Sequence, residues 1–307
     1  MKVIITGGAG FIASHVADAY IKAGHKVAII DNLATGSRRN VNPKAKFYKA
    51  DIRDARAMDR IFAKEKPMVV NHHAALVSVA DSVENPLPVY ETNIMGTANV
   101  LSAFGARGKG KHKKFIFASS GGAVYGDPKK IPADESTPIA PISPYGFSKH
   151  IGEELLAFYG AQYGFSHLIF RYTNVYGPRQ NSKGEAGVVA LFGKIMKRGL
   201  PAKIYGDGSK VRDYVYVLDV VRANLIALRK GVRVTMNIGC GKEITDQMIF
   251  KTVASAIGYG KKPIYAPFRE GEIYRTTLDA SLAKRLIGWK PTVSLEEGIR
   301  RTIRGTL

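Results

Sequence analysis

Short apolar runs alternate with longer amphipathic stretches over the first 120 residues of this chain. The runs predict strands at residues 3–5, 26–30, 46–48, 68–70 and 114–118. The stretches between them predict helices, notably over residues 12–23, 55–65 and 94–104. Near-continuous apolar strands separated by helices are typical of a parallel sheet covered on both faces. The fold class is therefore predicted to be α/β, with a Rossmann-type doubly wound parallel sheet.

The pattern changes after a further predicted strand at residues 167–170. From about residue 175 the chain becomes irregular and rich in glycine, proline and charge. We therefore expect residues 1–174 to form the doubly wound domain and residues 175–307 a smaller C-terminal lobe. Residues 211–240 are expected to return to the first domain.

A glycine-rich turn, Thr6-Gly-Gly-Ala-Gly10, follows the first predicted strand and opens the first helix. Gly7 permits a tight turn, and Gly10 lets backbone amides approach a pyrophosphate at the helix N-terminus. An acid, Asp31, ends the second strand 21 residues after Gly10. A carboxylate there accepts hydrogen bonds from ribose hydroxyls and repels a 2′-phosphate, which favours NAD over NADP. Arg38 and Arg39 keep NADP open as an alternative.

Tyr145 and Lys149 stand four residues apart behind Ser143 and Pro144. Ser143 is suited to cap a helix and Pro144 to its first position, so the two side chains are predicted to share one helical face. A neighbouring ammonium favours the phenolate form of tyrosine and makes it a usable base. A second Tyr-x-x-x-Lys spacing begins at Tyr125, but the intervening Gly-Asp-Pro predicts a turn.

Composition and the N-terminal sequence argue against a membrane protein and a secreted, disulfide-bonded protein. The chain of 307 residues is 45% hydrophobic, enough for a substantial core, and no apolar run is long enough to predict a membrane span. The first residues enter a strand directly and lack the layout of a signal peptide. A single cysteine, Cys240, excludes an internal disulfide and fits a reducing cytoplasm, and we expect it to be a small buried residue.

The net charge of +21 is compatible with a nucleic-acid surface or with a polyanionic ligand. The basic residues are spread along the chain with only short clusters, such as Lys109–Lys114. No specific nucleic-acid partner is therefore expected, although weak nonspecific binding of polyanions is.

Ten ordered runs give the chain a resemblance to a known family over nearly its whole length. It resembles the extended short-chain dehydrogenases/reductases, and among them most closely the UDP-glucose 4-epimerases of the bacterial and archaeal type. The runs are Thr6-Gly-Gly-Ala-Gly-Phe-Ile12, Asp31-Asn-Leu33, His72-His-Ala-Ala75, Asn93-Ile-Met-Gly96, Ser119-Ser-Gly-Gly-Ala-Val-Tyr-Gly126, Ser143-Pro-Tyr-Gly-Phe-Ser-Lys149, Arg171-Tyr-Thr-Asn-Val-Tyr-Gly-Pro-Arg179, Gly184-Glu-Ala-Gly-Val-Val189, Gly206-Asp-Gly208 and Arg212-Asp-Tyr214.

The resemblance implies a catalytic group of Ser120, Tyr145 and Lys149. Tyr145 would be the base for the sugar 4-hydroxyl, Ser120 would bind the same oxygen, and Lys149 would bind the nicotinamide ribose. The implied cofactor is NAD, bound by Gly7, Gly10, Phe11, Ile12, Asp31, Asn32, Asp51, Ile52, Ala74, Ala75, Leu76, Asn93, Tyr145, Lys149 and Tyr172. The implied UDP-sugar contacts are Ser120, Tyr145, Asn174, Val188, Val189, Arg212, Arg269, Glu272 and Thr276. A homodimer through helices near 94–104 and 145–162 is also implied, and no metal site is expected.

The implied reaction is C4 epimerisation of a UDP-hexose, UDP-glucose or UDP-galactose, through a transient 4-keto sugar with NAD regenerated in each cycle. A 4,6-dehydratase is disfavoured because Gly121-Gly-Ala123, which cannot move protons, follows Ser120. A UDP-glucuronate decarboxylase, a UDP-glucuronate 4-epimerase and a UDP-GlcNAc 4-epimerase stay open. A catalytically silent dinucleotide-binding or nucleic-acid-associated protein is the non-enzymatic alternative.

Five residues depart from the family pattern. Ala13 replaces the usual third glycine, Val77 takes an often polar position, and Glu272 replaces the usual aspartate. His73 stands at a usually apolar position and is expected to be a packed core histidine. Thr276 falls near the position that limits the C2 substituent of the sugar, where a small residue could admit N-acetylated sugars.

Overall fold

The computed structural model describes residues 1–108, 110, 112–181, 187–268 and 273–305. Its central sheet has seven strands, each parallel to its neighbours, in the order β11-β6-β5-β4-β1-β2-β3. The strands are β1 (Lys2–Thr6), β2 (Lys26–Asp31), β3 (Lys46–Lys49), β4 (Val69–His72), β5 (Lys114–Ser120), β6 (Ser166–Tyr172) and β11 (Arg233–Ile238). This order confirms the doubly wound parallel sheet that the alternating pattern predicts.

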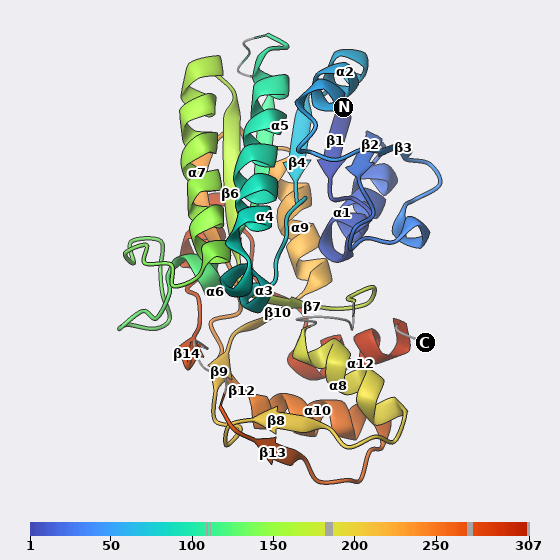
Figure 1. Ribbon diagram of the computed structural model, residues 1–307, viewed down its shortest axis with the longest axis vertical. Helices are drawn as coiled ribbons and strands as arrows, with labels where there is room; N and C mark the ends of the chain where they lie inside the picture. The colour runs from blue at the N-terminus through green and yellow to red at the C-terminus, as the bar shows by residue number, and fades with distance from the viewer. Residues whose placement is uncertain (109, 111, 182–186, 269–272, 306–307) are drawn as a thin grey trace.

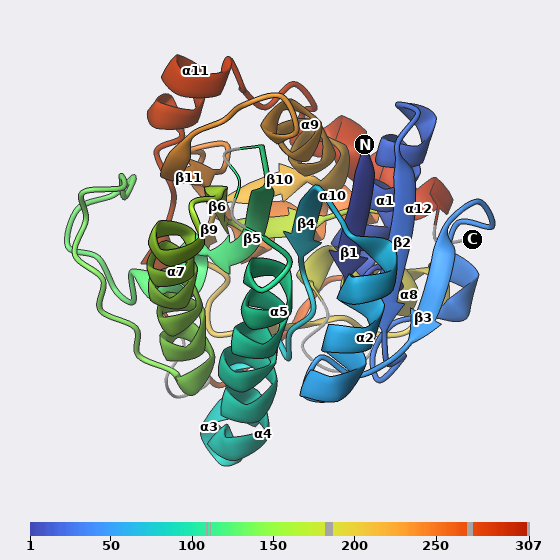
Figure 2. The same cartoon turned by 90° about the horizontal axis from the view of Figure 1, so that it is seen from above.

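Helices cover both faces of the sheet, as Figure 2 shows from above. One layer consists of α2 (Ala55–Glu65), α5 (Gly96–Gly105) and α7 (Pro144–Tyr163), and the other of α1 (Phe11–Lys22), α9 (Val217–Ala227) and α11 (Ser281–Ile287). Each layer encloses its own apolar core against the sheet. Phe62, Phe104 and Phe115 belong to the first core, and Tyr20, Phe170 and Trp289 to the second.

The remaining elements form a smaller lobe, drawn below the sheet in Figure 1, and the segments that connect to it. The lobe contains α8 (Val188–Lys197), α10 (Asp246–Ile257), α12 (Leu295–Gly305), the pair β8 (Lys203–Tyr205) and β13 (Ile264–Ala266), and the small sheet of β12 (Ile244–Thr245), β9 (Val211–Arg212) and β14 (Arg275–Thr276). A parallel pair, β7 (Asn174–Tyr176) and β10 (Tyr214–Tyr216), runs between the two bodies. Short helical segments complete the fold: η1 (Arg38–Asn40), α3 (Val79–Glu84), α4 (Pro86–Tyr90), the π-helical η2 (Glu91–Met95) and α6 (Gly121–Val124).

Helix α7 begins as its sequence predicts. The Ser143 hydroxyl accepts a hydrogen bond from the Gly146 amide, Pro144 occupies the first turn, and Gly164 closes the helix in the left-handed conformation. The other Tyr-x-x-x-Lys spacing, from Tyr125 to Lys129, lies in bends without helix, which confirms the predicted turn.

The order of the strands also locates a crevice. From β1 the sheet grows in one direction through β2 and β3 and in the other through β4, β5 and β6. Ligands of open α/β sheets bind outside the carboxyl ends of the strands at such a reversal. None of the helices in the described ranges has the length and apolarity needed to cross a bilayer.

Candidate active site

The carboxyl ends of the parallel strands place most of the predicted site residues along one edge of the sheet. Asp31 ends β2 and Ser120 ends β5, while Tyr172 ends β6 directly opposite Ser120 in the register. The glycine turn follows β1, and residues 73–76 follow β4. Residues far apart in sequence are therefore neighbours in space.

The glycine turn packs tightly against the segment after β4. Gly7 has φ 70°, and a Cβ atom placed on it would lie 2.7 Å from the Ala74 nitrogen. Only glycine fits there without a shift of backbone. Gly10 caps α1, and its amide donates to the Gly7 carbonyl at 3.0 Å. Phe11 and Ile12 begin the helix and are partly buried. The turn thus presents a helix N-terminus to the crevice, where an anionic group is favoured.

Asp31 lies against this turn. Its carboxylate accepts hydrogen bonds from the Ala9 amide at 2.9 Å and the Leu33 amide at 2.8 Å. The next residue, Asn32, donates from its side chain to Asp51 at 2.9 Å, and this contact joins the ends of β2 and β3. The Arg53 guanidinium, bonded to Asp51, lowers the pKa of that carboxyl to about 2. Ile52 is buried and touches Gly96, where a Cβ atom would lie 2.6 Å from the Ile52 side chain.

Tyr145 and Lys149 lie together in the first turns of α7, both buried. The Lys149 ammonium is 6.0 Å from the centroid of the Tyr145 ring and donates to the Ala118 carbonyl of β5 at 2.9 Å. Because Ser120 ends the same strand two residues later, this bond holds α7 beside the Ser120 edge. Burial lowers the pKa of Lys149 to about 8, and the Glu153 carboxylate opposes that shift. The Lys149 ammonium therefore loses its proton at a lower pH than the ammonium of an exposed lysine.

Asn93 connects three parts of the site from within the π-helical segment η2. Its side chain accepts from the Leu76 amide at 2.8 Å and donates to the Leu76 carbonyl at 2.9 Å. It also donates to the Ser148 hydroxyl at 3.0 Å, and that hydroxyl donates to the Tyr145 carbonyl at 2.7 Å. Asn93 thus holds the segment after β4 at a fixed distance from α7, and π-helical turns of this kind occur frequently at functional sites.

A buried ion pair behind Lys149 was not expected from the sequence. Glu153, one turn after Lys149, accepts from Arg171 on β6 at 2.6 Å and from the Ser119 hydroxyl at 2.5 Å. Arg171 also donates to the Tyr125 hydroxyl at 2.9 Å. Glu153 follows Lys149 by four residues, so the sequence could have placed the two side chains on one face of the helix. Its partner Arg171 could not have been found in this way, because only the folded sheet brings β6 next to α7.

Three of the predicted substrate residues, Asn174, Arg212 and Thr276, lie close together on β7 and the small sheet. Arg212 and Thr276 are direct partners in the register of β9 and β14. The Arg212 guanidinium donates to the carbonyls of Ile273 and Tyr274. Asn174 is exposed at the start of β7 and donates to the Asp213 carbonyl at 3.1 Å.

Two further predicted contacts begin α8, where Val188 is partly exposed and Val189 is fully buried in the core of the lobe. Of the two, only Val188 is therefore accessible to a ligand in this structure. Arg269 and Glu272 lie outside the described residues.

Comparison with known proteins agrees with this geometry. Residues 3–239 match the family described as "NAD dependent epimerase/dehydratase family". The chain belongs to the NAD-dependent epimerase/dehydratase family. It is 39% identical over 309 residues to a UDP-glucose 4-epimerase of Mycolicibacterium smegmatis, covering 99% of this chain and 97% of the relative.

Two solved structures are similar over almost the whole chain. A Thermotoga maritima UDP-glucose 4-epimerase with UDP-glucose has a TM-score of 0.96 and 47% identity, covering 99% of this chain and 98% of the other. A Thermus thermophilus UDP-glucose 4-epimerase in complex with NAD has a TM-score of 0.93 and 42% identity, with the same coverage. The resemblance inferred from the ten motifs is thereby confirmed.

In this member of the epimerase/dehydratase family, a buried carboxylate binds the backbone of two separate segments of the chain, around residues 240 and 278. Asp213, fully buried, accepts hydrogen bonds from the amides of Cys240 and Gly241 at 3.0 Å and of Leu278 at 3.4 Å. Burial raises its pKa to about 6. It precedes β10 and follows Arg212, so it fixes the strand that carries the predicted diphosphate contact. No sequence pattern indicates this role, because the hydrogen-bond donors to Asp213 are backbone amides.

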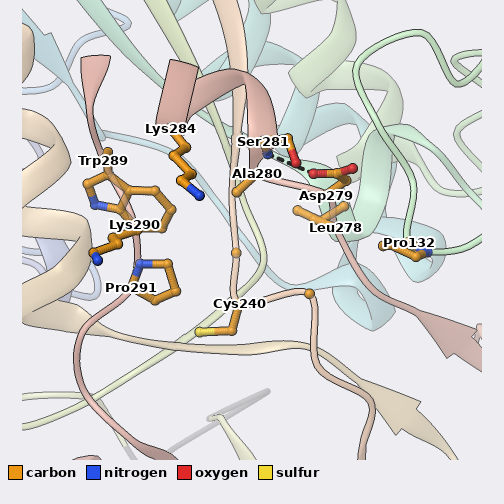
Figure 3. Close-up of a pocket in the computed structure, with 12 residues that line it drawn as sticks. Pro132, Cys240, Leu278, Asp279, Ala280, Ser281, Lys284, Trp289, Lys290 and Pro291 are labelled. Atoms are coloured by element: carbon orange, nitrogen blue, oxygen red, sulfur yellow. Dashed lines mark hydrogen bonds between the residues drawn. The ribbon is translucent and has the colours of Figure 1, made fainter. Parts of the chain in front are cut away.

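Cys240 lies in a separate hollow of about 300 Å³, also lined by Trp289, Lys284 and Lys290 (Figure 3). None of Ser120, Tyr145 and Lys149 lines it. Burial raises the pKa of the Cys240 thiol to about 12, so the thiol stays protonated and is a poor nucleophile. Cys240 is partly buried, whereas a buried residue was expected, because one side of it lines this hollow.

Proposed function

We propose that this protein is an NAD-dependent 4-epimerase of UDP-hexoses that interconverts UDP-glucose and UDP-galactose. The observation that carries the proposal is the group of Tyr145, Lys149 and Ser120 at the carboxyl edge of the sheet, across from the glycine turn. The similarity to UDP-glucose 4-epimerases with UDP-glucose or NAD supports it over nearly the whole length of the chain.

The residues around the glycine turn fit a dinucleotide. Gly7 leaves no room for a side chain beside Ala74, and Asp31 lies against the turn with a carboxylate suited to ribose hydroxyls. Gly10, Phe11 and Ile12 would hold the pyrophosphate end, and the residues from Ala74 to Leu76 would line the channel. NAD supplies the acceptor and donor of hydride at C4 of the sugar when it is bound.

Proton transfer would be carried out by the protein's own side chains, with Tyr145 at the centre. Tyr145 takes the proton of the sugar 4-hydroxyl and later returns it, acting as general base and then as general acid. The Lys149 ammonium stabilises the phenolate, and Ser120 hydrogen-bonds the sugar oxygen. Asn93 keeps Tyr145 in position through Ser148. Gly121, Gly122 and Ala123 offer no acid or base for C5 or C6, which favours epimerisation over dehydration.

The substrate would extend from this group towards the lobe. Arg212 is suited to pair with the diphosphate, because a guanidinium binds phosphate oxygens in a bidentate manner. Asn174 and the amides at the start of α8 would contact the uridine side, with Arg269 and Glu272 as further proposed contacts. The test is incubation of the purified protein with UDP-galactose and detection of UDP-glucose. No conversion of any UDP-hexose, together with tight DNA binding at physiological salt, would reject the proposal in favour of the non-enzymatic alternative.

Thr276 supports N-acetylated UDP-hexoses as additional substrates. Its side chain is buried on β14 beside Arg212. A residue as small as threonine at this position would take less of the space that a C2 substituent needs than a larger side chain would. Replacing it with tyrosine should lower kcat/KM for UDP-N-acetylgalactosamine at least tenfold more than for UDP-galactose. Equal losses for the two sugars would remove Thr276 from this role.

We further propose a homodimer in the cytoplasm, formed through the helices near residues 94–104 and 145–162, which include the end of η2, α5 and α7. Leu87, Met95 and Phe158 are 67%, 59% and 65% exposed, and they lie on α4, η2 and α7. Those elements pack on one another along one side of the sheet. Large exposed apolar side chains in contiguous elements are typical of a subunit interface.

A further inference from the structure

His73 differs from its neighbour His72 in the hydrogen bonding of its ring nitrogens. The His72 nitrogens face the hydroxyls of Thr6 at 2.7 Å and Thr97 at 2.9 Å. Both His73 nitrogens are buried and have no hydrogen-bond partner among the described residues. Buried polar atoms of native proteins are nearly always paired, so an imidazole with two unpaired nitrogens needs an explanation. The ring of His73 is packed as expected, but its two nitrogens lack the partners that a buried imidazole normally has.

The position of His73 supplies that explanation. Its amide donates to the Thr6 carbonyl at 3.1 Å, and its carbonyl carbon would lie 2.9 Å from a Cβ atom on Gly7. Its ring stacks on Tyr172, with 6.1 Å between centroids. Burial, and then the charge of Lys149, lower the pKa of His73 to about 3, so the ring is neutral at physiological pH. The backbone of His73 thus lies against the glycine turn, and its imidazole lies beside Tyr172 and close enough to Lys149 to be affected by its charge. All three neighbours are proposed to bind the cofactor.

We propose that His73 is a positioning residue for the cofactor, and that its imidazole hydrogen-bonds the carboxamide of the nicotinamide. This inference rests on the proposed function, which places the nicotinamide end beside Tyr145 and Lys149. A neutral imidazole carries one donor and one acceptor, and a carboxamide offers the matching acceptor and donor, whereas phosphate oxygens only accept.

The ring can reach such a partner without a change of backbone. The residue as a whole is partly exposed although its nitrogens are covered. The proposal requires a rotation about the Cβ–Cγ bond, for which histidine has a broad preference, to bring a nitrogen to the carboxamide. A turn of the ring on NAD binding would pair an atom that the structure leaves unpaired.

The experiment compares dissociation constants for NAD and for ADP-ribose, which lacks the nicotinamide, measured by calorimetry on protein freed of bound nucleotide. His73→Phe should raise the Kd for NAD about tenfold and leave the Kd for ADP-ribose unchanged. The melting temperature of the nucleotide-free variant should not fall, because a buried unpaired group has been removed. His73→Asn, which keeps a donor and an acceptor, should restore most of the affinity for NAD.

His167→Phe is the matched control. His167 also has an unpaired buried ring nitrogen, but it lies near the amino end of β6, away from the crevice. Its replacement should leave both dissociation constants unchanged. An unchanged Kd for NAD in His73→Phe, or equal losses for NAD and ADP-ribose, would overturn the inference while the proposed function stands. Failure of the unaltered protein to bind either nucleotide would overturn both. If His73→Phe does not fold, His73→Leu replaces it in the same comparison.

Discussion

At the scale of single residues, the site depends on charges that the fold buries together. The helical spacing of Tyr145 and Lys149 was predictable from the sequence, as was the cap at Ser143. The placing of Glu153 between Lys149 and Arg171 was not, because Arg171 belongs to a strand paired with β5. Asp213 escaped prediction for a related reason, since its partners are amides from loops far along the chain.

The lowered pKa of Lys149 predicts a pH dependence of activity. As the pH rises through about 8, the ammonium loses its proton and the charge that stabilises the Tyr145 phenolate disappears. The kcat should therefore fall on the alkaline side with an apparent pKa near 8. Glu153→Gln should move this limb to lower pH, because the carboxylate that raises the pKa of Lys149 is gone. A profile that stays flat to pH 10 in the unaltered protein would contradict the assignment.

The same group predicts how stability changes with pH. The pKa of Lys149 is about 8 in the folded protein and 10.5 is the ordinary value for lysine, so the unfolded chain binds more protons between these two values. The free energy of unfolding should therefore gain from Lys149 as the pH rises from 8 to 10.5. Urea titrations of the unaltered protein and of Lys149→Met, compared across this interval, measure the gain, which the variant should lack.

At the scale of helices and strands, the elements that the sequence predicted are those with buried apolar runs. The strands β1 to β6 and the helices α1 and α2 match the predicted segments within a few residues. Strand β11, with the partly polar sequence RVTMNI at the edge of the sheet, was not predicted. The helix expected at 94–104 is divided, since its first part belongs to the π-helical η2 around Asn93. The formation of β11 and the π-helical turn around Asn93 both depend on tertiary contacts, which local sequence propensity does not contain.

Gly152 sets the distance between α7 and β5. A Cβ atom there would lie 2.6 Å from the Phe117 ring, which also flanks the Lys149 ammonium at 5.2 Å. Gly152→Ala should push α7 away from the Ser120 edge and lower kcat at least tenfold. We expect a loss of about 1–3 kcal/mol from overpacking, partly offset by the higher helix propensity of alanine. The measurements are kcat and the free energy of unfolding, with Gln162→Ala on the exposed end of α7 as control. Full activity in Gly152→Ala would show that this spacing is not critical.

At the scale of the whole molecule, two surface features stand out: the exposed apolar side chains of α4, η2 and α7, and the net charge of +21. The arrangement of sheet and crevice was predictable, because a doubly wound sheet fixes where its strands end. The path of the chain after residue 175 was not, since the lobe consists of short strands paired across long separations, such as β9 with β14. The charge of +21 is a property of the surface and carries no information on the fold.

The proposed dimer makes a clear prediction for the exposed apolar face. Phe158→Glu places a charge on that face and should convert the protein to a monomer in sedimentation velocity experiments. Met248→Glu is the control, because Met248 is 45% exposed on α10 in the lobe. A dimer that persists in Phe158→Glu, or dissociates equally in both variants, would place the interface elsewhere.

The most direct test of the account concerns the phenolic oxygen of Tyr145. Tyr145→Phe keeps the ring and removes the group proposed to carry the proton, whereas Tyr159→Phe makes the same change about four turns further along α7 and at a distance from Ser120. The rate of UDP-galactose conversion and the amount of bound NAD are measured for the unaltered protein and both variants. We expect Tyr145→Phe to lose at least a thousandfold in kcat while retaining NAD, and Tyr159→Phe to keep its activity. Conversion by Tyr145→Phe at a rate close to that of the unaltered protein would contradict the account.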